Sequence, residues 1–225
     1  MSRNMNDSKF LTLLNASEFR PIQQRSEVLA LLTLIRSKRY SSMLEIGTST
    51  GGTSVLISRA LEKPAQLTTV DLEKRYDAER LQKAFPRRSD VRLLIADSHD
   101  KQTVDLVKSD RSHGFDVVFI DGDHSYEGVR LDTLRFAPLT NPGGVLVFHD
   151  IVDADVSGHS SHSDVYVGGV PSWWRQMCEC VGERTEEFVA DRNQSGYGIG
   201  VVHLPEGTSA VGELVAEWSE LEMLT

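Results

Sequence analysis

The stretch that decides the fold is Met43-Leu44-Glu45-Ile46-Gly47-Thr48-Ser49-Thr50-Gly51-Gly52. It opens with a short apolar run, typical of a buried strand, and a glycine-bearing turn follows directly. Residues 53–61 then carry apolar side chains at helical spacing, which predicts a helix after the turn. Strand, turn and helix in this order form the first half of a βαβ unit, so a parallel sheet is expected.

The same alternation of apolar runs and amphipathic stretches continues downstream. Pro138 and the segment Asn141-Pro142-Gly143-Gly144 predict a turn before the last strand of this series. The pattern indicates a single α/β domain with helices between parallel strands. The predicted strands are Leu67–Leu72, Val91–Asp97, Phe115–Asp121 and Gly143–Asp150, and the predicted helices are Tyr76–Phe85, Lys101–Lys108 and Tyr126–Phe136.

The regions on either side complete the domain. Residues 1–40 are predicted to form a helical cover, with helices at 9–14 and 21–39, and to make one globular unit with residues 41–225. Residues 151–169 are polar and lack periodicity, which is typical of a lid or binding loop. The other predicted elements are a helix from Pro171, an antiparallel pair of strands at 185–189 and 198–204, and a helix at 211–223.

An acidic residue stands at or near the end of each of five predicted strands. In an open parallel sheet, ligands bind beyond the carboxyl ends of the strands, where the strand order reverses. Any one of these acids has an equally good explanation as the cap of the next helix, whereas the aligned set favours a ligand site. The five acids are Glu45, Asp71, Asp97, Asp121 and Asp150.

Composition narrows the class of partner. The 225 residues carry a formal net charge of -9, which argues against binding a nucleic-acid backbone. No apolar run approaches the roughly 20 residues that cross a bilayer, and the polar start lacks a signal core, so a cytoplasmic protein is expected. Cys178 and Cys180 are the only cysteines and predict neither a disulfide nor a zinc site.

The glycine spacing separates this chain from dehydrogenases. These carry Gly-x-Gly-x-x-Gly, whereas here the order is Glu45-x-Gly47-x-x-x-Gly51. This turn resembles motif I of class I S-adenosylmethionine-dependent methyltransferases, and the resemblance spans roughly residues 43–204. It implies a Rossmann-like, seven-stranded, mostly parallel sheet with an antiparallel last strand and helices on both faces. It also implies S-adenosylmethionine as the cofactor.

The resemblance gives roles to residues along the first three strands. Gly47, Thr48 and Gly51 are expected to bring the backbone close to the cofactor, and Glu45 to lie near its ammonium group. Asp71 is expected at the ribose hydroxyls. Asp97 and Ser98 are expected near the adenine amine, and Asp121 at the cofactor as well.

Two polar clusters follow the next two strands, Asp121-Gly122-Asp123-His124 and Phe148-His149-Asp150. With the start of the helix at Pro171, they resemble macrocin-type sugar O-methyltransferases and cephalosporin hydroxylase-like proteins. They are also similar to metal-dependent catechol and caffeoyl-CoA O-methyltransferases, whose Asp-Asn pair is His149-Asp150 here. Asp121, Asp150 and His149 are the implied ligands of a divalent metal, with Mg²⁺ expected, and His149 has an alternative role in orienting Asp150.

His124 is the predicted general base, since an imidazole titrates near neutral pH, although it has an alternative role in ordering the turn. The expected reaction is O-methylation of a small molecule, a sugar or a phenol, bound beneath the 151–169 loop. The loop histidines His159 and His162 are taken as surface. One of Trp173 and Trp174 is expected to line the substrate pocket, and the other to pack on the core.

Two alternatives remain open at this point: a hydroxylase-like or other non-methylating enzyme on the same fold, and a catalytically silent binding subunit. The apolar stripe of the N-terminal helices is also compatible with a homodimer. The acceptor and the metal are left undetermined.

Overall fold

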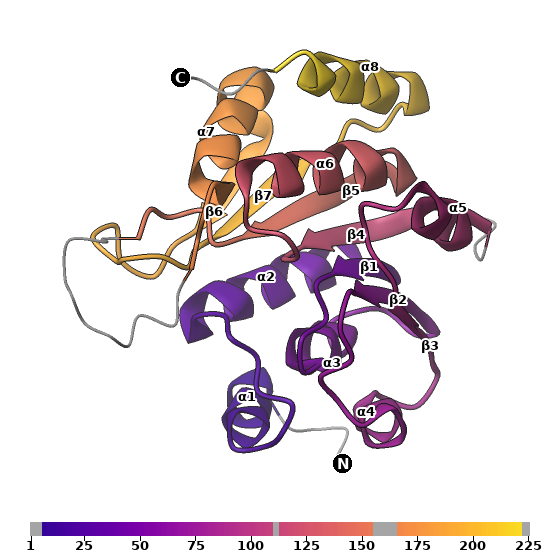
Figure 1. Ribbon diagram of the computed structural model, residues 1–225. Helices are drawn as coiled ribbons and strands as arrows, with labels where there is room; N and C mark the ends of the chain where they lie inside the picture. The colour runs from indigo at the N-terminus through magenta and orange to yellow at the C-terminus, as the bar shows by residue number, and fades with distance from the viewer. Residues whose placement is uncertain (1–5, 110–112, 155–165, 222–225) are drawn as a thin grey trace.

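The computed structural model describes residues 6–109, 113–154 and 166–221. Its centre is one seven-stranded sheet in the order β3-β2-β1-β4-β5-β7-β6 (Figure 1). Strands β1 to β5 are parallel, and β7 lies antiparallel to both β5 and β6, which confirms the predicted fold class. The strands are β1 (Ser42–Ile46), β2 (Ala65–Asp71), β3 (Ser89–Ile95), β4 (Phe115–Ile120), β5 (Thr140–His149), β6 (Thr185–Phe188) and β7 (Ile199–His203).

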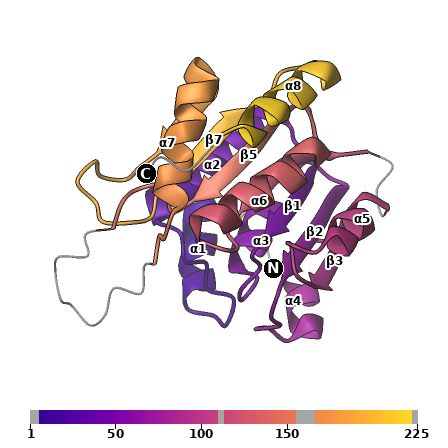
Figure 2. The same ribbon diagram turned by 45° about the horizontal axis from the view of Figure 1, so that its top comes forward.

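Helices cover both faces of this sheet. The first four lie on one face and the last four on the other, and Figure 2 views the molecule with the second face turned forward. The helices are α1 (Asp7–Asn15), α2 (Arg25–Lys38), α3 (Gly52–Ser58), α4 (Ala78–Ala84), α5 (Lys101–Ser109), α6 (Tyr126–Phe136), α7 (Val170–Val181) and α8 (Thr208–Ser219). Two 3-10 turns, Ala137–Leu139 and Gly182–Arg184, precede β5 and β6.

The central strands supply side chains to both hydrophobic layers. On β4, Val117 and Phe119 pack with α1 to α4, whereas Val118 and Ile120 pack with α5 to α8. Successive side chains of a strand point to opposite faces, so a strand covered by helices on both sides needs a continuous apolar run. The runs that predicted the strands have this physical origin.

The N-terminal helices share the core of the sheet. Phe10 and Leu11 of α1 and Leu31 and Leu32 of α2 are buried in the same hydrophobic cluster as the strands. Among the described residues, no helix is long and apolar enough to cross a membrane. The division into a cover and a main domain, and the homodimer, stay predictions.

The predicted turn at Asn141–Gly144 is wrong, because these residues lie inside β5. Phe115 pairs with Thr140 and Val117 with Val145, so four residues of β5 bulge opposite Asp116. Gly143 has a φ of 74°, which glycine adopts without strain, and its amide donates to the Pro205 carbonyl at 3.0 Å. The same residue types that make turns thus make a bulge here.

Four helices are shorter than predicted. The helix expected at 21–39 begins at Arg25, the one expected at 53–61 ends at Ser58, and the last helix ends at Ser219. The helix expected at 76–85 spans only Ala78–Ala84. Residues 20–24 are instead a non-helical segment that reaches the sheet edge. This difference matters for the site, because the segment contributes a side chain to it.

Candidate active site

A cleft of about 640 Å³ lies at the carboxyl edge of the sheet. The strand order reverses between β1 and β4, so this is the switch point where open α/β sheets bind ligands. The ends of β1 to β5 all contribute to its lining. Those of the predicted site residues that line it are Gly47, Asp71, Asp97, Ser98, Asp121, His124, His149 and Asp150.

The glycine-bearing turn presses against the end of β4. Gly47 has a φ of 92°, and a Cβ there would lie 1.9 Å from the Asp121 carbonyl oxygen, so only glycine fits. Asp71 accepts hydrogen bonds from the amides of Ser49 at 2.7 Å and Glu73 at 2.9 Å. The Asp71 carboxylate therefore fixes the turn while lining the cleft.

Three of the predicted cofactor residues do not line the cleft. Glu45 is fully buried and accepts a hydrogen bond from Ser54, and burial raises its pKa well above the usual range. Thr48 is also buried, and Gly51 is the left-handed N-cap residue of α3. These residues support the turn from beneath, and their direct contact with a cofactor stays a prediction.

The end of β3 brings a histidine that sequence analysis missed. Asp97 accepts from the His99 amide at 2.8 Å, and the His99 ring lines the cleft beside Ser98. Its Nε2 lies 3.4 Å from Oδ1 of the fully buried Asp132 on α6. Burial raises the pKa of Asp132 to about 6. No sequence signal marks this pair, because its members come from separate elements.

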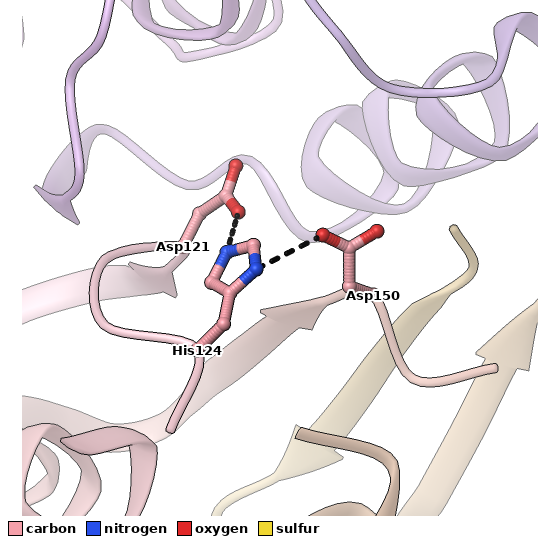
Figure 3. Close-up of side chains that lie close together, drawn as sticks. All are labelled: Asp121, His124 and Asp150. Atoms are coloured by element: carbon pink, nitrogen blue, oxygen red, sulfur yellow. Dashed lines mark hydrogen bonds and ion pairs between the residues drawn. The ribbon is translucent and has the colours of Figure 1, made fainter. Parts of the chain in front are cut away.

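The ends of β4 and β5 bring two acids and two histidines together. Figure 3 shows three of them, Asp121, His124 and Asp150. His124 Nε2 lies 3.3 Å from Asp121 Oδ1, and His124 Nδ1 lies 3.6 Å from Asp150 Oδ2. His149 Nδ1 lies 3.2 Å from Asp121 Oδ1 and 3.2 Å from Asp150 Oδ2, the two oxygens that also face His124. This group of four, the acid–histidine cluster, confirms that the two polar motifs face one another.

Local structure sets the direction of each side chain in this cluster. The N-cap of α6 is Ser125, whose hydroxyl accepts from the Gly128 amide at 3.0 Å, so His124 is free of the capping role. The His124 ring instead faces Asp121 and Asp150 and contacts the Tyr166 carbonyl. Asp150 has a φ of 63°, an uncommon conformation for a residue other than glycine.

The cluster raises the basicity of its histidines. Burial alone lowers the pKa of His149, but Asp121 and Asp150 outweigh it and raise that pKa to about 10. Burial likewise lowers the pKa of His124, yet hydrogen bonds to Asp121 and Tyr166 and the charge of Asp150 raise it to about 9. The two imidazoles in turn outweigh burial and lower the pKa of Asp121. At neutral pH, both imidazoles are therefore in their protonated, positively charged form.

The cluster also has the donor set of a cation site. Asp121, His124 and Asp150 each offer one ligand atom, and these atoms lie within 4.8 Å of one another. Asp150 Oδ1 is buried and has no hydrogen-bond partner among the described residues. An orphaned carboxylate oxygen beside a second acid suits a divalent cation. His149 stands behind this set, nearly enclosed, with 3% of its surface exposed.

Other lining residues were missed from the sequence. Tyr166 stacks on His124 at 6.3 Å between ring centroids, and Tyr197 meets the edge of His149 at 6.2 Å. Gln23, from the segment before α2, donates to Asp121 Oδ2 at 3.1 Å. Polar and aromatic residues in loops give no periodic signal, and only the tertiary fold brings them here.

The expectation that a tryptophan lines the substrate pocket is wrong for the cleft described here. Trp173 is fully buried and donates to Thr133 at 2.9 Å, and Trp174 is buried and donates to Glu187 at 2.6 Å. Neither ring reaches the cleft lining among the described residues. His159 and His162, taken as surface, lie outside the described residues, as does most of the predicted lid.

Residues 44–151 match a protein family described as a methyltransferase domain. No curated protein matches the chain in sequence. Among solved structures, the O-methyltransferase from Bacillus cereus in complex with S-adenosylhomocysteine is 17% identical with a TM-score of 0.60, over 88% of this chain and 90% of that chain.

Two further structures extend the comparison. The O-methyltransferase TomG from Streptomyces achromogenes, in complex with S-adenosylmethionine, is 20% identical with a TM-score of 0.58, over 90% of this chain and 91% of that chain. MycE methyltransferase of mycinamycin biosynthesis, with Mg, S-adenosylhomocysteine and mycinamycin VI, is 19% identical with a TM-score of 0.60. That match covers 91% of this chain and 56% of MycE.

The chain thus has the fold of class I methyltransferases, which confirms the predicted resemblance. The family match over β1 to β5 covers the strands whose ends form the cleft.

Proposed function

We propose that this protein transfers the methyl group of S-adenosylmethionine to a hydroxyl of a small molecule, beside a divalent cation. One observation carries the proposal: the glycine-bearing turn and the acid–histidine cluster open into the same cleft. A methyl donor and an activated hydroxyl must meet within a few ångströms, and the shared cleft provides that proximity.

The β1 to β3 side of the cleft is the proposed cofactor side. Gly47 lines the cleft without a side chain, so the backbone can approach the cofactor, and Asp71 presents a carboxylate for the ribose hydroxyls. Asp97 and Ser98 lie further along the same edge, toward the adenine. The bound S-adenosylmethionine and S-adenosylhomocysteine in the solved structures of the same fold support this placement.

The β4 and β5 side is the proposed chemical side. Asp121 and Asp150 would hold the cation, with Mg²⁺ the expected metal, since both present carboxylate oxygens at the cleft. Such a cation lowers the pKa of a coordinated hydroxyl and fixes its direction. The presence of Mg in the MycE structure supports this part of the proposal.

His124 is the proposed general base. In the transfer, the bond from sulfur to the methyl carbon breaks, a bond from the acceptor oxygen forms, and the hydroxyl proton passes to His124. A base must be neutral, and the carboxylates that raise the His124 pKa to about 9 are the proposed cation ligands. Once their charge is shared with a metal, they hold the imidazole proton less strongly.

The acceptor is proposed to be a small molecule with an apolar or planar part. Ile22 is 56% exposed and Tyr166 73% exposed, and both line the cleft, Tyr166 over His124. Side chains of this kind favour the body of a natural product, either a phenol or a sugar-bearing compound. The mycinamycin VI bound in MycE supports an acceptor of this size class.

The test is calorimetric titration with S-adenosylmethionine, with Mg²⁺ and then with chelator, followed by mass analysis of acceptor reactions. Saturable binding and addition of one methyl group to the acceptor are expected. Addition of an oxygen atom instead would favour a hydroxylase-like enzyme. Absence of binding at millimolar cofactor would sink the proposal and favour a silent binding subunit.

A further inference from the structure

Gln23 links the two sides of the cleft through its side-chain amide. The residue lies just before α2 and is 7% exposed. Its amide nitrogen donates to Asp121 Oδ2 at 3.1 Å, and its carbonyl oxygen accepts from the Thr53 hydroxyl at 2.6 Å. Thr53 stands in the first turn of α3, directly after the glycine-bearing turn.

Only one orientation of this amide satisfies both neighbours. A carboxylate accepts hydrogen bonds and cannot donate, so the amide nitrogen must face Asp121. The carbonyl oxygen then faces Thr53, whose hydroxyl supplies the proton. The opposite orientation would place two acceptors against each other at Asp121.

The segment that carries Gln23 is held tightly against the start of α3. A Cβ on Gly52 would lie 2.3 Å from the Phe19 carbonyl oxygen and 2.5 Å from the Pro21 nitrogen. The Thr50 hydroxyl donates to the Arg20 carbonyl at 3.1 Å. The backbone of residues 19–21 is therefore anchored to the start of α3, and the Gln23 amide that follows is held at both ends.

The hydrogen bond from Gln23 occupies one oxygen of the Asp121 carboxylate and leaves the other to face the histidines. Oδ2 receives the amide, while Oδ1 faces the Nε2 of His124 and the Nδ1 of His149. A donor on one oxygen fixes the rotation of the carboxylate and so directs the other oxygen. Ligand orientation of this kind typically changes metal affinity by about 10- to 100-fold.

We propose that Gln23 is a positioning residue that orients Asp121 as a cation ligand and couples the N-terminal segment to the chemical side of the cleft. This inference rests on the proposed cation site at Asp121 and Asp150. It gives the residues before α2 a role in metal affinity that their sequence does not signal. It also makes the start of α3, through Thr53, part of the same support.

The test uses Mn²⁺ alone, followed by electron paramagnetic resonance and calorimetry, on the full chain. Gln23→Met keeps the length of the side chain and removes both hydrogen bonds, and we expect it to weaken Mn²⁺ binding about 10- to 100-fold. Gln24→Ala is the matched control, because Gln24 makes no side-chain cap bond at the start of α2. Its Mn²⁺ affinity should equal that of the wild-type protein.

Thr53→Val provides a second, milder variant should Gln23→Met fail to fold. It removes one hydrogen bond from the amide and leaves Gln23 in place, so a loss of about fivefold in Mn²⁺ affinity is expected. Equal Mn²⁺ affinity in the wild type and in the folded variants would overturn the proposed role of Gln23 but would leave the proposed cation site in place. Absence of Mn²⁺ binding by the wild-type protein would overturn the cation site as well.

Discussion

The two halves of the sheet edge use the same sequence device for different purposes. On the β1 to β3 half, the strand-end acids Asp71 and Asp97 accept hydrogen bonds from backbone amides at 2.7 to 2.9 Å. On the β4 and β5 half, Asp121 and Asp150 face imidazoles at 3.2 to 3.6 Å. Asp71 and Asp97 therefore hold the backbone of the loops that follow their strands, whereas Asp121 and Asp150 form charged pairs with the two histidines.

The difference follows from what surrounds each acid. Asp97 is exposed, so water and a single amide satisfy it. Asp150 is 4% exposed and keeps one oxygen without a partner among the described residues. A buried, incompletely satisfied carboxylate is costly unless a charge joins it. This contrast supports the proposed placement of the cofactor on one half and of the cation on the other.

The largest expected effect on Mn²⁺ binding and on the rate of methyl transfer comes from neutralising the buried Asp150 carboxylate on the β4 and β5 half. Asp150→Asn should abolish Mn²⁺ binding and lower the rate of methyl transfer by at least about 10³-fold, because the cation loses a carboxylate. Calorimetry with Mn²⁺ and an acceptor assay measure the two losses. Asp153→Asn, on an exposed residue paired with Arg175, is the control and should leave both unchanged. Unaltered Mn²⁺ affinity in Asp150→Asn would break the comparison.

Removal of the proposed base, His124, should have the second-largest effect on the turnover rate. His124→Gln keeps a polar side chain but cannot take up the proton, so the turnover rate should fall about 10²-fold or more. Binding of S-adenosylhomocysteine should change little, since His124 lies on the chemical half. A rate assay and a cofactor titration measure these separately. His203→Gln, remote from the cleft on β7, is the control; equal rates in both variants would count against the base role.

The pH dependence of cation affinity sharpens the contrast in charge. The pKa values of about 9 for His124 and about 10 for His149 mean that both are protonated near neutral pH. A cation and an imidazolium compete for the same carboxylates, so binding releases a proton and Mn²⁺ affinity should rise about tenfold per pH unit from about 7 to 9. Calorimetry across that range measures the slope. A flat profile would contradict the charge pairing.

The smallest of these effects is expected on the cofactor half. Asp71→Asn keeps one acceptor for the Ser49 amide but removes the charge offered to the ribose, so S-adenosylhomocysteine affinity should fall about tenfold. Mn²⁺ affinity should be unchanged. Parallel titrations with the two ligands measure both, with the exposed Asp105→Asn on α5 as the control. Weaker Mn²⁺ binding in Asp71→Asn would show that the halves are not separate.

The sequence predicted the strands of the sheet more accurately than the turn at residues 141–144 and the ends of the helices. Strands β1 to β5 were predicted from apolar residues at fixed places in the alternation. Burial on both faces makes continuous apolar runs necessary in the central strands β1 and β4, whereas the edge strand β3 is only partly buried. The turn at residues 141–144 was misassigned, because proline and glycine mark turns and bulges alike. Helix ends shifted by a few residues, since end positions depend on caps and packing.

The candidate site divides in the same way. Asp121, His124, His149 and Asp150 were predicted because they lie at or shortly after the ends of strands, and the ends of parallel strands meet at one edge. Gln23, His99 and Tyr166 were missed, because residues from separate loops meet only when the sheet and its covers are assembled.

Sequence alone therefore determined the order of elements, the class I fold and the edge at which the polar residues gather. Apolar period and glycine spacing are local properties, readable along the chain. Tertiary structure alone decided which acids are buried, which face imidazoles and which amide orients Asp121. Burial and pairing are properties of neighbours distant in sequence, and the charges and pKa values of the cluster follow from them.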